Sequence, residues 1–187
     1  AYKLYFTDWT NVSNIYLNSS STSPISTDYS QGPTGWIFND KFYTTVYSGS
    51  NFRMFYTDGT YSSHNTNTNG PFSAQSYRIA GDNLHFSASD NNGGLEIWKS
   101  DGTFTNTKML NEISTPGYWR TYLTNAFRVD TTDYLVLKPD FSAYNNFPWI
   151  SKYELWKVNN FNDSLIKVSS SNIEFKFGAG YTDIGNK

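Results

Sequence analysis

An alternating strand that runs into an Asp-Gly turn occurs twice in this chain, and this recurrence constrains the fold more than any other feature. LEIWKSDGT spans residues 95–103, and the similar FRMFYTDGT spans residues 52–60. Glycine accepts positive φ and aspartate can hydrogen-bond its own following backbone, so each Asp-Gly pair suits a tight turn after a strand. Such self-similarity indicates a repeat fold, in which LEIWKSDGT is structural and not an active site.

Two weaker copies of the same pattern flank the clear ones. TTDYLVLK (131–138) leads to KYELWKVNNFND (152–163) downstream, and YKLYFTDW (2–9) leads to SNIYLNSSS (13–21) at the start. The first separations between equivalent aromatic positions are about 40 residues, as in a four-stranded propeller blade. The last separation is longer because residues 139–151 lengthen the final copy. The anchoring aromatic residues of the four copies are Tyr16, Phe55, Trp98 and Trp156.

The two ends of the chain carry complementary strands. The stretches GWIFND, SYRIAGD and AFRVDTTD each supply a strand before one of the later copies, whereas the first copy has no such strand. Asn172–Phe177 has the pattern of a strand with no copy after it. Pairing of Tyr2–Thr7 with Asn172–Phe177 would close a ring and remove two sheet edges. We therefore predict a single domain over residues 1–187, folded as a small four-bladed β-propeller, with a β-sandwich as the alternative.

The composition supports an all-β fold. Aromatic residues make up 19% of the chain and charged residues 16%. Tyr, Phe, Trp and Thr suit pleated strands, while Asn, Asp, Gly and Ser suit the turns between strands.

The third copy resembles a known repeat. LHFSASDNNGGLEIWKSDGTFTNTKML, residues 84–110, is similar to the ELWxTDGT-type repeat of bacterial secreted β-propeller-like proteins. The second copy matches this pattern less closely. In the fourth copy Val158-Asn159-Asn160 replaces the Asp-Gly turn, and in the first Asn18-Ser19-Ser20 replaces it. The resemblance implies the propeller fold and implies little about chemistry.

Charge and hydrophobicity exclude several classes of partner. The net charge is −2, and without a concentrated positive face we expect no nucleic-acid partner. No apolar run approaches the ~20 residues that span a bilayer, so we expect no membrane insertion. A low-charge surface rich in Tyr, Asn, Ser and Thr suits an extracellular or cell-surface protein. A chain that begins at Ala1 is what a removed signal peptide would leave, as would trimming.

The sequence contains few signals for catalysis or metal binding. It has no cysteine, and its two histidines, His64 and His85, have no companion ligands at metal-binding spacing. As His85 lies between two apolar strand residues, it should point to the opposite face from Leu84 and Phe86. The loop DNNGGLE offers oxygen atoms that calcium favours, although a plain hairpin explains the same pattern. The candidate calcium ligands are Asp90, Asn92 and Glu96; no other cofactor is expected.

Aromatic residues outside the repeat positions are the candidate binding groups. Loop aromatics beside Asn, Asp and Arg are typical of sites that stack on the apolar face of a sugar ring. We therefore predict a non-enzymatic, lectin-like module that binds a glycan or cell-surface polysaccharide. The alternatives are a surface protein that self-associates through the Phe141–Trp149 loop, and a glycan-processing enzyme. The predicted ligand-binding residues are Trp9, Trp119, Arg120, Tyr144 and Trp149.

Overall fold

The chain forms β-structure in the residues that the computed structural model describes, and the strands of each sheet are antiparallel. The prediction of an all-β fold is confirmed. Within these residues no helix has the length and hydrophobicity that crossing a membrane requires. The described residues are 2–3, 5–7, 12–14, 26–27, 35–48, 51–58, 65–66, 71–89, 94–111, 120–140 and 153–168.

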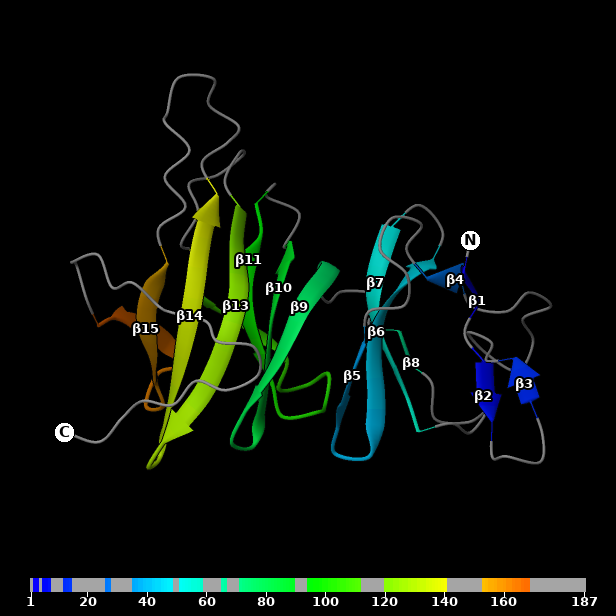
Figure 1. Ribbon diagram of the computed structural model, residues 1–187, viewed down its shortest axis with the longest axis horizontal. Helices are drawn as coiled ribbons and strands as arrows, with labels where there is room; N and C mark the ends of the chain where they lie inside the picture. Colours follow the sequence, from blue (N-terminus) through cyan, green and yellow to red (C-terminus); the bar gives the residue numbers. More distant parts are fainter. Residues whose placement is uncertain are drawn as a thin grey trace, which may run out of the picture.

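Three consecutive four-stranded meanders make up most of the described structure (Figure 1). In each, every strand pairs with the strand that follows it. The first meander comprises β5 (Gly35–Phe38), β6 (Lys41–Ser48), β7 (Asn51–Thr57) and β8 (Asn65–Thr66). The second comprises β9 (Phe72–Ala80), β10 (Asn83–Ser89), β11 (Glu96–Ser100) and β12 (Lys108–Asn111). The third comprises β13 (Arg120–Val129), β14 (Thr132–Asp140), β15 (Glu154–Asn159) and β16 (Ser164–Lys167).

Few backbone contacts join one meander to the next. A single residue pair, Arg53 with Phe72, connects β7 to β9 and so places the first two meanders in one ten-stranded sheet. The third meander is a separate sheet, joined to the second by a parallel bridge between Leu95 and Arg120. Side-chain packing therefore holds the three meanders together.

Four short strands precede the first meander. β1 (Tyr2–Lys3) pairs with β4 (Ser26–Thr27), which in turn pairs with β6, and β2 (Tyr5–Thr7) pairs with β3 (Val12–Asn14). The strand predicted to close the ring with Tyr2–Thr7, Asn172–Phe177, lies outside the described residues, as does the anchor Tyr16. The other three anchors, Phe55, Trp98 and Trp156, each lie in the third strand of a meander. Within the described residues the sheets do not form a closed barrel or propeller.

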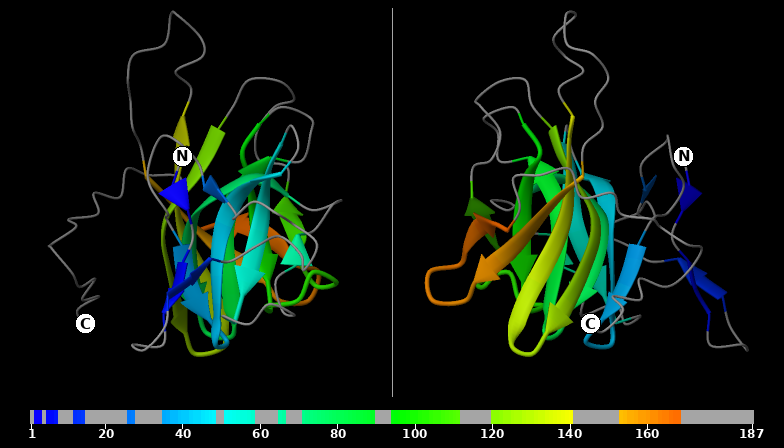
Figure 2. Two further views of the ribbon diagram at one scale, coloured as in Figure 1. Left: turned by 90° about the vertical axis from the view of Figure 1, so that its right-hand side faces the viewer. Right: turned by 60° about the vertical axis from the view of Figure 1, so that its left-hand side comes forward.

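The second meander, drawn in green between the other two (Figure 1 and Figure 2), has a hydrophobic core on each of its faces. Leu84 and Phe86 of β10 contribute to the first core cluster, which they share with Tyr43 and Met54 of the first meander. On the other face, Ile97 belongs to the second core cluster. The remaining fully or nearly fully buried residues of the second core cluster are Leu110, Leu123, Leu135, Leu137, Val158 and Leu165.

The polar residues of β10 point away from the first core cluster, as alternation along a strand requires. Both His85 and Ser87 are fully buried. The hydroxyl oxygen of Ser87 accepts a hydrogen bond of 2.8 Å from the backbone N–H of Leu123 in the third meander, and His85 contacts Asp133 there. The expected orientation of His85, opposite to Leu84 and Phe86, is therefore the one observed.

The Asp-Gly turn of the LEIWKSDGT copy is held by its own side chains and by the preceding meander. Asp101 Oδ1 accepts hydrogen bonds from the N–H (2.9 Å) and the hydroxyl (2.7 Å) of Thr103, and Asp101 Oδ2 accepts one from Asn106 (2.6 Å). Gly102 has φ +98°, a conformation that favours glycine. Its carbonyl accepts a 3.0 Å hydrogen bond from the buried hydroxyl of Tyr43. The motif is structural, because it docks one meander on another.

The corresponding turn of the third meander keeps the same chemistry with different residues. β15 continues through Asn159, because Val158 is buried in the second core cluster, and the turn occupies residues 160–163. The sequence pattern had instead placed Val158 in the turn. Asn159 Oδ1 accepts a 3.0 Å hydrogen bond from the N–H of Phe161, as Asp101 does from Thr103. An asparagine therefore takes the place of the aspartate in this copy.

Replacing Tyr43 by Phe should lower the free energy of unfolding by about 1–2 kcal/mol, because the Gly102 carbonyl loses a buried donor. Urea unfolding followed by circular dichroism measures this difference. Tyr56→Phe is the control, since the hydroxyl of Tyr56 donates to no carbonyl within the described residues while its ring packs against that of Tyr43. Equal effects of the two substitutions would contradict the docking role of the Tyr43 hydroxyl.

Candidate functional site

The first strands of the three meanders lie next to one another, and a partly exposed aromatic ring is found where they meet. β9 contacts β13 on one side and β5 on the other. Trp36 of β5 keeps 39% of its surface exposed. It shares a face of the strand with Phe38, which belongs to the first core cluster, and it is paired across the ladder with Tyr43. Trp36 therefore lies at the rim of the first core cluster.

Local packing fixes the position of this strand. The ring of Phe42 lies over Gly35, where a Cβ atom would come within 2.1 Å of it, so glycine is needed at this position. The turn after β5 consists of Asn39 and Asp40, both with positive φ, which is the geometry of a tight hairpin. Ile37, on the opposite face from Trp36, is 71% exposed.

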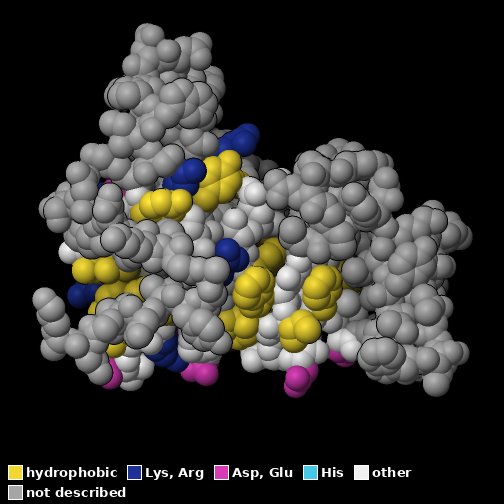
Figure 3. Space-filling view, in the orientation of Figure 1, with side chains coloured by type: hydrophobic (Ala, Val, Ile, Leu, Met, Phe, Trp, Pro, Cys, Tyr) yellow, Lys and Arg dark blue, Asp and Glu magenta, His cyan; other side chains and the backbone are white. Residues whose placement is uncertain are grey.

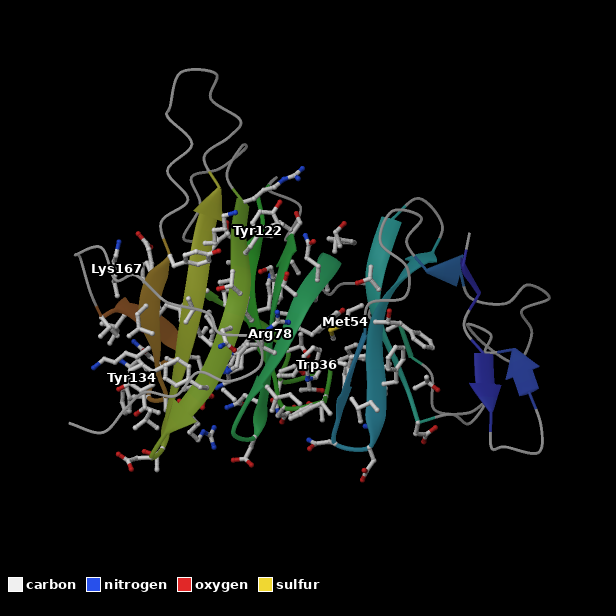
Figure 4. All side chains as sticks on the ribbon, in the orientation of Figure 1. Trp36, Met54, Arg78, Tyr122, Tyr134 and Lys167 are labelled. Atoms are coloured by element: carbon white, nitrogen blue, oxygen red, sulfur yellow. The ribbon has the colours of Figure 1, made fainter. Side chains whose placement is uncertain are left out.

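Arg78 of β9 links the three meanders at this point. Its guanidinium lies over the Trp36 ring, 5.3 Å from the ring centroid. Arg78 Nε donates a 3.0 Å hydrogen bond to the carbonyl of Thr124 in β13, and Nη1 donates one of 2.7 Å to the carbonyl of Tyr77. We call Trp36 and Arg78 together the Trp36–Arg78 site. Figure 4 labels both residues near the middle of one face of the molecule, where Figure 3 shows basic and hydrophobic surface side by side.

The charge of Arg78 is not balanced by a carboxylate among the described residues. Burial lowers the pKa of Arg78, and no carboxylate of the described residues forms an ion pair with it. Arg128 is the contrast, because it pairs with Asp82 at 2.9 Å and with Asp133 at 2.6 Å. The Trp36–Arg78 site thus combines an accessible ring with a partly desolvated cation.

A second polar cluster is buried between the second and third meanders. Asp133, fully buried, accepts hydrogen bonds from Asn83 (2.9 Å) and from Arg128, and His85 Nε2 lies 3.1 Å from its Oδ2 atom. Arg128 lies so close over Gly81 that a Cβ atom there would be 1.7 Å from its Cζ. Asn83, His85 and Arg128 therefore all direct a polar group at the Asp133 carboxylate, while Arg128 Nη1 donates to Asp82.

The protonation states of the buried cluster follow from its geometry. Burial raises the pKa of Asp133, but hydrogen bonds from His85, Arg128 and Asn83 outweigh it and bring the pKa to about 2. Burial lowers the pKa of His85 more than Asp133 raises it, so the imidazole is neutral at neutral pH. Because the ionised carboxylate only accepts, His85 donates through Nε2–H. Its Nδ1 atom is buried and has no partner within the described residues.

Few of the residues predicted from sequence fall in the described part of the chain. Arg120 is exposed at the start of β13, four residues before Thr124. Glu96 is 2% exposed within β11 and has a polar or ring partner. In the described ranges, no group of three or more potential metal ligands is found. The predicted residues that lie outside the described ranges are Trp9, Asp90, Asn92, Trp119, Tyr144 and Trp149, and the whole Phe141–Trp149 loop lies outside them as well.

Sequence reasoning did not select Trp36 or Arg78. Trp36 was assigned only to a first strand, and Arg78 lies in SYRIAGD without a recognised motif. One signal was present in GWIF, because an apolar pair such as Trp36-Ile37 has to expose a side chain if only one face of its strand is covered. Which of the two would be near a cation depends on how the meanders stack.

Comparison with protein-family models, with curated protein sequences and with solved structures finds no match to this chain. Functional inference therefore depends on the geometry of the described residues.

Acidification should destabilise the protein in two separate ranges of pH. The pKa of His85 is lower in the folded chain than the value of about 6.5 in an unfolded chain, so the folded state binds fewer protons. The stability associated with this group is present above pH ~6.5 and is lost as the pH falls below it. Asp133 adds a second loss as the pH falls from about 3.9 towards about 2.

Urea unfolding between about pH 7 and about pH 5 measures the first range. The variant His85→Gln should show a flatter dependence of the unfolding free energy on pH than the unmodified chain. His64→Gln, which changes the other histidine of the chain, is the matched control and should keep the full dependence. The same slope in all three proteins would show that His85 is not buried as a neutral group.

Proposed function

We propose that this protein is a non-enzymatic carbohydrate-binding module and that the Trp36–Arg78 site is where it contacts a glycan. The exposed ring of Trp36 carries this proposal. An indole ring can stack on the apolar face of a pyranose, and neighbouring polar groups then bond its hydroxyls. The donors of Arg78 lie beside the ring, held by the carbonyls of Thr124 and Tyr77.

The exposure of the Trp36 ring favours a role in ligand binding over a role only in covering the first core cluster. Phe38, on the same face of β5, is 5% exposed, whereas Trp36 is 39% exposed although it is larger. A tryptophan that served only the first core cluster would gain more by full burial. The three adjacent first strands supply a rigid base, and sites built on strands hold their geometry better than sites on loops.

We also propose that the three meanders are blades of a four-bladed β-propeller. Their common strand order, their face-to-face cores and the adjacent position of β5, β9 and β13 support this arrangement. The resemblance of residues 84–110 to the repeat of secreted propeller-like proteins supports it as well. In such a fold the Trp36–Arg78 site would belong to the inner strands. The same resemblance, with the low content of charged residues, supports an extracellular or cell-surface location.

The carbohydrate-binding proposal is tested by a glycan array followed by calorimetry with the best ligand. Trp36→Ala should weaken binding about tenfold or more, which corresponds to about 1.4 kcal/mol of lost stacking. Ile37→Ala is the matched control, because it removes an exposed side chain from the other face of the same strand. Light scattering on the same sample establishes whether the chain self-associates.

Two results would contradict this proposal. One is a folded sample that forms large open assemblies and binds no glycan, which would favour the self-associating surface protein. The other is glycan binding that survives Trp36→Ala and is lost in Trp149→Ala, which would move the site to the loop predicted from sequence.

Ring closure is tested by disulfide formation, since the chain has no cysteine of its own. Phe6→Cys is combined in turn with a cysteine at each position from 172 to 177. Directly opposed residues of paired antiparallel strands have Cα atoms about 4.5–5.5 Å apart, within reach of a disulfide. We expect oxidation to cross-link one or two of these combinations. Phe127→Cys with Tyr134→Cys, which are directly opposed in β13 and β14, is the positive control. A cross-linked control with no cross-linked test pair would contradict closure through these strands.

A further inference from the structure

The orientation of the Arg78 guanidinium is fixed by the protein itself. Nε and Nη1 donate to the carbonyls of Thr124 and Tyr77, which belong to two different meanders, and Cζ lies over the Trp36 ring, 5.3 Å from its centroid. A guanidinium has five N–H donors, and these two hydrogen bonds use two of them. The group is therefore held in place before any ligand arrives, and its other N–H groups donate to no acceptor among the described residues.

The cost of this arrangement points to an anionic ligand. A cation that is removed from water is stabilised by a counter-charge, and proteins pair such groups with carboxylates. Arg128 follows this rule with Asp82 and Asp133. Arg78 is also partly buried, but within the described residues it has only carbonyl oxygens and a ring as partners. Among the described residues, Arg78 has neutral acceptors for its hydrogen bonds and no carboxylate that balances its charge.

The residue type matches a planar anion. An arginine presents parallel N–H groups that fit the two oxygens of a carboxylate, whereas a lysine is a point charge without that geometry. The exposed ring beside the guanidinium suits the sugar that carries the anion. The two groups are close enough to contact one residue of a glycan together.

We propose that the Trp36–Arg78 site selects acidic glycans, with Trp36 against the sugar ring and Arg78 bonded to the carboxylate of a uronic acid. This inference rests on the proposed carbohydrate-binding function and specifies its ligand class. Trp36 contributes affinity for the sugar in general, and Arg78 contributes the preference for the carboxylated sugar.

The test compares three oligosaccharides of the same length by calorimetry. The first contains a uronic acid, the second is its carboxyl-reduced neutral counterpart, and the third is the neutral compound carrying a sulfate ester. The unmodified protein should bind the uronic acid oligosaccharide about tenfold more tightly than the neutral one. Arg78→Gln should weaken binding of the uronic acid oligosaccharide about ten times more than binding of the neutral one, so that the preference disappears, and Arg78→Lys should retain only part of the preference.

Two controls separate this effect from loss of folding and from net charge. Thermal unfolding of each variant establishes that it is folded at the temperature of the binding measurement. Lys157→Gln, on β15, removes one positive charge outside the Trp36–Arg78 site and should keep the full preference for the uronic acid. The dependence on Arg78 is then a property of that position.

The failures of the two proposals are distinguishable. If none of the three compounds binds and a glycan array is also negative, the carbohydrate-binding function itself is wrong. If the neutral and uronic acid compounds bind equally, or if Arg78→Gln weakens both to the same extent, the function stands and the selection of acidic glycans is overturned. Tighter binding of the sulfated compound than of the uronic acid would also overturn the assignment to carboxylates.

Discussion

Packing of the second meander on both faces is the interaction on which the rest of the structure depends. Alternate residues of β10 enter different environments: Leu84 and Phe86 join the first core cluster, while His85 and Ser87 face the third meander. When both faces of a sheet are covered, its polar side chains cannot form hydrogen bonds with water. They must therefore form hydrogen bonds with the neighbouring meander. The bonds to Asp133 and to the Leu123 N–H meet this requirement, and they fix how the third meander sits on the second.

The site follows from the same packing. Stacking the meanders brings β5, β9 and β13 together, although they are separated by long stretches of chain. Arg78 spans the junction, with its ring partner in the first meander and a carbonyl partner in the third. The site is therefore not a property of any one repeat copy, and no repeat copy carries a motif for it. The repeat copies differ in sequence, and equivalent positions in the three first strands carry different residues. A site built from several copies is therefore expected where no single copy has a binding motif.

Much of the local structure could be predicted from residue patterns. Alternation and turn chemistry are local, so the all-β class, the strands around GWIFND, SYRIAGD and AFRVDTTD, and the orientation of His85 away from Leu84 and Phe86 followed from short stretches. The Asp-Gly turn at Asp101 was also anticipated, since the hydrogen bonds that the Asp101 side chain accepts come from no further along the chain than Asn106. The end of β15 was not, because burial of Val158 in the second core cluster extends the strand by contacts with distant residues.

The candidate site also combines features set by short stretches of sequence with features set by contacts between distant residues. By itself, the sequence determined that strands, turns and abundant aromatic side chains would be present, and it drew attention to aromatic loops. Only the tertiary structure decided that Phe38 is buried while Trp36 on the same face is partly exposed, and that Arg78 lies against it. The physical reason is that hydrogen-bonded turns and alternation depend on neighbours in the chain. Exposure and charge pairing depend instead on which surfaces the folded meanders place against one another.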